Sequence, residues 1–320
     1  MNLLFLSLWV GLLALGFAWV GRKSAKKRPE LNGVSPVTGF GLLLGFGLAS
    51  WSLGFSAAFV VPPLLLGIHP SFKEGQPARW WNQLGVVVLA GWMLFAVYPF
   101  GEFALDRQFL GYFVLLLVYL FQNIKLFSKP VAVSGYQVGV IAVGLLLVSY
   151  FAFEERRAFP VVWLPLLLAW GLLCVLPFAI KGLVFGRQIG AVLGLVAGVL
   201  VLKVTNNVAE FIALGICFFP LYMDWPAQRF LSNAHRTFSL AEFWVVERKW
   251  EAKLVSGGFW VVQFMVGLFA LQGTSFGYTG MAVFLALLFI GVFALTRRET
   301  RLMAKLSLPV PTTDSNFPGI

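Results

Sequence analysis

Long apolar stretches, separated by short polar segments, dominate the chain. A helix that spans the roughly 30 Å core of a bilayer needs about 20 apolar residues, and many stretches here approach or exceed that length. They predict an all-α, polytopic transmembrane bundle. The candidate segments are 2–20, 37–61, 80–100, 108–124, 131–153, 159–180, 188–202, 204–223 and the uncharged run 254–296.

Two of these segments contain helix-breaking residues. The run 254–296 is too long for one helix, and Gln272-Gly273-Thr274-Ser275 is its natural turn. Dividing the run there gives ten segments in all. Pro62-Pro63 predicts a break or an interfacial dip over 62–68, because proline lacks a backbone donor and disfavours helix in the residue before it.

Composition supports lipid as the medium. Hydrophobic residues make up 59% of the 320 residues, and charged residues only 12%, against about 25% in soluble domains. Residues 1–307 are expected to form one transmembrane domain. The tail 308–320, rich in proline and polar residues, is expected to be disordered.

The net charge of +11 is better explained by basic cytoplasmic loops than by nucleic-acid binding. If all ten segments cross, the 24 Lys and Arg divide into nine and 15. If 188–223 crosses only once as a unit, they divide into 17 and six, with Lys203 left at membrane depth. The positive-inside rule favours the second division. It predicts nine net crossings, the N-terminus outside and the C-terminus in the cytoplasm.

The most informative polar stretch lies between two apolar segments. Lys203, Asn206, Asn207 and Glu210 are spaced i, i+3, i+4 and i+7, which places them on one stripe of a helix. Ionisable groups at membrane depth are costly and usually face a cavity or a partner. These four residues are therefore a candidate substrate-binding site. The alternative is an ordinary loop in the headgroup region.

A second polar region, 224–253, mixes charged and aromatic residues and is typical of an amphipathic helix at the cytoplasmic interface. Arg229, His235 and Arg236 could hold a phosphate, and Asp224 lies beside them in sequence. The alternative is a loop that only anchors the chain to lipid.

Other patterns indicate packing or exclude chemistry. Gly190, Gly194 and Gly198, spaced by four, permit close helix contact. Cys174 and Cys217 form no metal or disulfide motif, and Asp106, Asp224 and Asp314 are too far apart to form a magnesium-binding pair. No phosphate loop, HExxH or nucleophile elbow is present. No metal or cofactor is expected.

Three functions fit this sequence. The first is a permease or carrier for a small solute or amphipathic lipid, with a polar site at membrane depth. The second is an enzyme that acts on a lipid or isoprenoid at the cytoplasmic interface. The third is a non-catalytic subunit or assembly factor of a membrane complex. The expected partners are the bilayer, a small-molecule or lipid substrate, and other subunits in a homo- or hetero-oligomer; nucleic acid is not expected.

Overall fold

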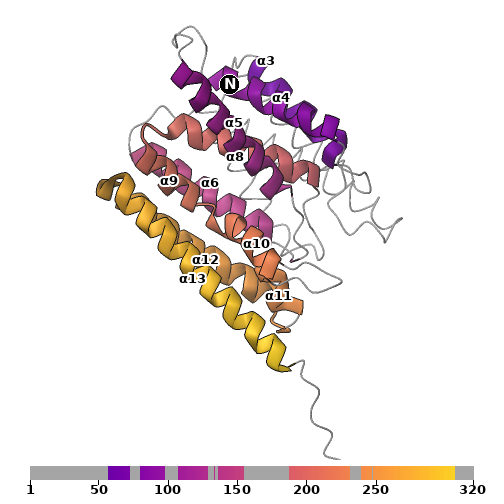
Figure 1. Ribbon diagram of the computed structural model, residues 1–320, viewed down its shortest axis with the longest axis vertical. Coiled ribbons are helices and arrows are strands. Elements are labelled where there is room, and N and C mark those ends of the chain that lie inside the picture. The colour runs from indigo at the N-terminus through magenta and orange to yellow at the C-terminus, as the bar shows by residue number, and fades with distance from the viewer. Residues whose placement is uncertain are drawn as a thin grey trace, which may run out of the picture.

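The computed structural model describes residues 57–72, 80–97, 107–128, 133, 136–154, 187–230, 239–246 and 248–306. All regular elements within these ranges are helices (Figure 1), which confirms the all-α prediction for them. The predicted segments 2–20 and 159–180 and the tail 308–320 lie outside the described residues. The helices are α3 Ala57–Ile68, α4 Trp80–Val97, α5 Arg107–Phe127, α6 Tyr136–Glu154, α8 Arg187–Val204, α9 Val208–Ile216, α10 Phe219–Phe230, α11 Leu240–Val246, α12 Ala252–Gln272 and α13 Gly277–Leu306, with short 3-10 turns η1 Pro70–Phe72 and η3 Gly273–Phe276.

The long apolar run folds as the sequence predicts, into two helices and a turn. α12 ends at Gln272, η3 covers Gly273–Phe276, and α13 begins at Gly277. Gly277 has a φ of 71°, a conformation that glycine adopts without the steric cost of a Cβ. The helical stretch Ala252–Glu299 is apolar enough to cross a membrane, and only 11% of its most apolar window is buried.

The predicted break at Pro62-Pro63 is wrong. α3 runs from Ala57 to Ile68 with both prolines inside it. Proline removes two backbone donors there, but its fixed φ of about −65° is a helical value, so the backbone can continue. The helix ends instead before His69-Pro70, because helical geometry is disfavoured for the residue that precedes a proline.

The glycine stripe of α8 packs against α5, as predicted. A Cβ added at Gly190 would lie 2.1 Å from the Phe127 carbonyl oxygen, and one at Gly194 would lie 2.5 Å from that of Asn123. At Gly198 it would meet the Leu120 side chain at 2.7 Å. Each glycine lets the two backbones approach at a distance that a side chain would prevent. These contacts also show that α5 and α8 are antiparallel.

The described helices run in two opposite directions, and both α6 and α8 begin at the end of the bundle where α5 stops. α9 and α10 run parallel to α5. The Tyr222 hydroxyl donates to the Asn123 side chain, and the Phe211 ring makes an edge contact with Tyr119, which lies earlier in α5. They are therefore antiparallel to α8, and 188–223 is a helical hairpin rather than a single net passage. This arrangement does not confirm the nine net crossings that the charge count favours.

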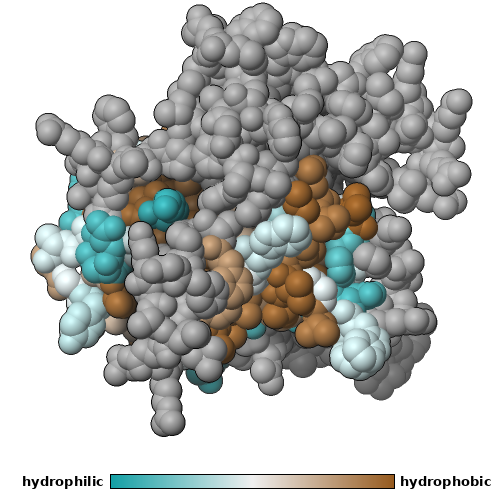
Figure 2. Space-filling model, turned by 90° about the horizontal axis from the view of Figure 1, so that it is seen from above, coloured by the Kyte–Doolittle hydropathy of each residue, from teal (hydrophilic) through white to brown (hydrophobic). Residues whose placement is uncertain are grey.

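The helix ends gather at two ends of the bundle. The Gln137 side chain donates to the Phe127 carbonyl, which places the start of α6 beside the end of α5. Trp260 packs on Gly139, and Gly267 on Leu147, so α6 and α12 are parallel. We call the end that holds Phe127, Arg187 and Lys253 the basic end, and the end that holds η3 and Lys203 the turn end. Hydrophobic side chains also reach the surface between polar ones on the face drawn in Figure 2.

Candidate functional site

The predicted polar site is an interruption between two helices at the turn end. α8 stops at Val204, and Asn207 caps the N-terminus of α9. Its side-chain oxygen accepts from the Glu210 backbone N–H at 2.9 Å. The Glu210 carboxylate in turn accepts from the Asn206 backbone N–H and from the Asn207 amide, both at 2.8 Å. This reciprocal arrangement is a variant of the capping box.

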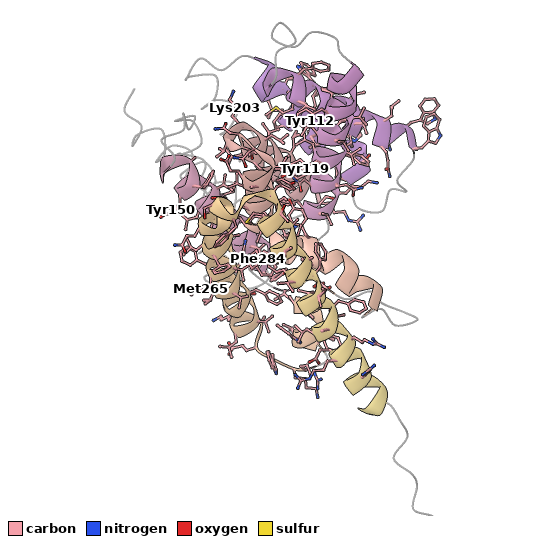
Figure 3. All side chains as sticks on the ribbon, turned by 60° about the vertical axis from the view of Figure 1, so that its left-hand side comes forward. Tyr112, Tyr119, Tyr150, Lys203, Met265 and Phe284 are labelled. Carbon is pink, nitrogen blue, oxygen red and sulfur yellow. The ribbon has the colours of Figure 1, made fainter. Side chains whose placement is uncertain are left out.

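The four predicted residues therefore do not share one helical stripe. Glu210 is buried, with 8% of its surface exposed, while Lys203, Asn206 and Asn207 are exposed. The structure brings Asn206, Asn207 and Glu210 together. Lys203 projects from the turn end, away from the far end of α13 (Figure 3). The short helix α9 begins at this interruption because Asn207 satisfies the free N–H of Glu210 in its first turn.

A second break, inside the bundle, separates α9 from α10. Pro220 has no N–H to bond back to Ile216, and the Leu221 N–H bonds the Phe218 carbonyl at 3.1 Å instead of Cys217. The Cys217 carbonyl is thereby released from the helical pattern. Irregular backbone at membrane depth must find other partners within the protein.

Gln263 of α12 supplies that partner. Its amide nitrogen donates to the Cys217 carbonyl at 2.7 Å and to the Val140 carbonyl of α6 at 2.6 Å. Gln263 is fully buried. Because this atom lies within hydrogen-bond distance of two carbonyl oxygens, which can only accept, it is assigned as the amide nitrogen. The other atom, Oε1, is a buried acceptor with no hydrogen-bond partner in the described part of the chain.

Two tyrosines and an asparagine lie near the same break. The Tyr222 hydroxyl, on α10, donates to the Asn123 side-chain oxygen at 2.7 Å. The Tyr119 hydroxyl is buried beside both groups. Figure 3 shows Tyr119 within the bundle. We call Tyr119, Asn123, Cys217, Tyr222 and Gln263 the polar core.

The second predicted region does not form one amphipathic helix. Asp224 belongs to α10, α11 covers only Leu240–Val246, and α12 begins at Ala252. Lys249, with a φ of 55°, lies in the turn that separates α11 from α12. Of the proposed phosphate-binding residues, His235, Arg236 and the side chain of Arg229 lie outside the described part of the structure.

The Asp224 carboxylate connects neighbouring helices through hydrogen bonds. It accepts from the Tyr136 hydroxyl at 3.2 Å and from the Leu240 backbone N–H at 3.3 Å. Ser239 and Glu242 form a capping box at the same helix start, with bonds of 3.0 and 3.1 Å. Asp224 therefore links α6, α10 and the first turn of α11, with only 6% of its surface exposed.

The sequence contained signals for the polar core that charge-based reasoning missed. Asn123 and Gln263 are amides inside otherwise apolar segments, and Pro220 interrupts the segment 204–223. Within the described residues, no group of three His, Cys, Asp or Glu is placed to hold a metal. Comparisons with known protein families and with characterised proteins found no match to this chain.

Proposed function

We propose that the chain is a multi-pass membrane protein, with α12 and α13 crossing the bilayer as a hairpin. α12 contains 21 residues, about 32 Å at 1.5 Å per residue. The apolar part of α13, from Tyr278 to Thr296, is about 28 Å long by the same measure. Both lengths match a hydrocarbon core of about 30 Å. Large apolar side chains on both helices face outward, including Leu254, Met265, Phe269, Leu287 and Ile290.

Charge supports one orientation for this bundle. Described bases gather at the basic end, among them Lys125, Arg187, Lys253 and Arg297, whereas Lys203 lies at the turn end. The positive-inside rule places the basic end, with the C-terminus, in the cytoplasm. The predicted external N-terminus depends on residues outside the described part of the chain.

The function we propose is that of a carrier for a small solute, with the polar core on its route. One observation carries this proposal: the helix α9–α10 is broken inside the bundle, and the amide that holds the break, Gln263, keeps an unmatched buried acceptor. Discontinuous helices near mid-membrane are a recurring feature of transporter binding sites. The polar core contains amides, hydroxyls, a thiol and backbone carbonyls but no charged side chain, and so it suits a neutral solute that donates hydrogen bonds.

Flux through proteoliposomes tests the carrier function. Purified protein is reconstituted, and uptake of ammonia, urea, glycerol and small sugars is compared with uptake into empty liposomes. We expect faster flux of at least one solute. The substitution Tyr119→Phe, which removes one buried hydroxyl, should reduce that flux. Tyr278→Phe, at a residue with 69% of its surface exposed, should leave it unchanged. Equal flux with and without protein for every solute would contradict the proposal.

A second candidate is a subunit of a larger membrane complex. Aromatic residues with large exposed surfaces, Phe269, Phe276 and Tyr278, lie near the turn end of α12 and α13. Such residues suit either lipid or a neighbouring protein. Copurification of a stoichiometric partner in mild detergent would favour this candidate, and recovery of the chain alone would count against it.

A further inference from the structure

The basic end carries a concentrated set of exposed positive charges where α12 begins and α13 leaves its apolar stretch. An ion pair fixes the two segments together: both Arg248 Nε and Nη2 donate to Glu299 Oε2, at 3.1 and 2.6 Å. Leu295 of α13 packs at the same place on the cluster formed by Leu240 and Phe243 of α11. The exposed bases around this junction, which we call the basic rim, are Lys249, Lys253, Arg297, Arg298 and Arg301.

The described acids at this junction are fewer than its bases. Among the described acids at the junction, Glu299 is engaged by Arg248, and Glu251 is the remaining exposed carboxylate. The helix dipole does not account for Arg297 and Arg298 either. α13 continues to Leu306, and the dipole effect is confined to the last turn of a helix. Five bases at one junction repel one another, and anions from outside the chain would relieve that repulsion.

The position of the basic rim points to the source of those anions. On α12, Lys253 is followed directly by Leu254, with 70% of its surface exposed. On α13, Arg297 comes four residues after the exposed Phe293. The change from apolar to basic surface thus falls at the same level on both helices. Trp250, exposed and 5.4 Å from the ring of Trp244, sits at this level, where tryptophan is enriched in membrane proteins.

We propose that the basic rim binds the headgroups of anionic phospholipids in the leaflet around α12 and α13. Arginine forms paired hydrogen bonds to phosphate oxygens, and basic groups near an anionic leaflet are attracted to it. The exposed apolar faces of the two helices hold the acyl chains of the same lipids. This inference rests on the membrane placement proposed above, and it is independent of the solute route.

The test measures lipid preference of the full-length purified protein. Native mass spectrometry in neutral detergent compares binding of phosphatidylglycerol with that of phosphatidylcholine, and soluble glycerol phosphate forms a third arm. The rim variant replaces all five bases by glutamine. The control variant carries Arg187→Gln and Lys203→Gln, at exposed bases outside the rim. A third variant, Arg297→Lys with Arg298→Lys and Arg301→Lys, keeps the charge.

We expect the wild type to prefer phosphatidylglycerol, and the rim variant to bind it about tenfold more weakly or worse, because basic groups attract anionic headgroups. The control and charge-keeping variants should retain most of the preference.

Wild-type affinity in the rim variant would overturn the proposal, as would an equal loss in the control. Binding of glycerol phosphate as strong as that of the lipid would assign the site to free phosphate esters instead. If the rim variant does not fold, loss of the preference in the charge-keeping variant, or no weakening of wild-type binding by salt, overturns the proposal. Stable protein in bilayers without any lipid preference would reject the rim site and leave the membrane placement intact.

Discussion

At the scale of single residues, Gln263 has the most consequential position. One amide nitrogen satisfies a carbonyl of α6 and a carbonyl released by the α9–α10 break. Hydropathy did not reveal it, because one amide hardly changes the mean hydropathy of a long apolar segment. The partner carbonyls, at Val140 and Cys217, are backbone atoms that no sequence pattern marks.

Replacing Gln263 by leucine should lower the free energy of unfolding by about 1–3 kcal/mol, because two buried carbonyls lose their donor. Thermal unfolding of the purified protein in detergent measures the change. Gln272→Leu, at the exposed end of the same helix, is the matched control and should have little effect. Equal stability of the Gln263 and Gln272 variants would show that the bonds to Val140 and Cys217 do not hold the break.

Single glycines of α8 determine how closely this helix packs against α5. Gly194→Ala should destabilise the protein by about 1–3 kcal/mol, since the added methyl group would overlap the Asn123 backbone. Gly291→Ala is the control, because nothing lies within 4 Å of its added Cβ. Alanine there should be neutral or slightly stabilising, since it favours helix. If both variants unfold at the same temperature, the close α5–α8 contact is wrong.

At the scale of elements, the start of α9 depends on Asn207 and Glu210. The sequence correctly identified these polar residues as a unit but placed them on a continuous helix. Periodicity alone could not show that Asn207 prefers to cap a helix rather than continue it. The Glu210 carboxylate accepts from Asn206 and Asn207, so its partners lie within this short stretch of chain.

Removing this cap should have a measurable cost. Asn207→Ala should reduce the free energy of unfolding by about 0.5–2 kcal/mol, the usual range for a lost N-cap. The exposed neighbour Lys203 provides the comparison, and Lys203→Ala should change stability far less. Chemical denaturation in detergent gives both values. A larger loss for Lys203→Ala than for Asn207→Ala would contradict the capping role.

Element boundaries were predicted well where apolar length and turn residues agreed. Segments 80–100 and 108–124 correspond to α4 and α5, and the turn after Gln272 was placed correctly. The errors have physical causes. Pro62-Pro63 was given too much weight because proline's helical φ offsets part of its cost. Segment 204–223 was treated as one unit because Pro220 was not weighed as a break, and the donor to the released Cys217 carbonyl, Gln263, comes from α12.

At the scale of the whole molecule, most of the described bases lie at one end of the bundle. The sequence favoured a single net passage at 188–223, and the structure does not confirm that preference. The antiparallel pairing of α8 with α9–α10 depends on contacts with α5, namely Tyr222 with Asn123 and Tyr119 with Phe211. Such contacts between distant segments are not visible in a hydropathy profile.

The central claim is that α12 and α13 cross the bilayer as a hairpin, with the basic end in the cytoplasm. Labelling of single cysteines with a membrane-impermeant thiol reagent in intact cells tests it, in a background without Cys174 and Cys217. Ser275→Cys, in the turn between the two helices, should be labelled from outside. Lys253→Cys and Arg301→Cys should be labelled only after the membrane is opened. Labelling of all three positions from the same side would contradict the account.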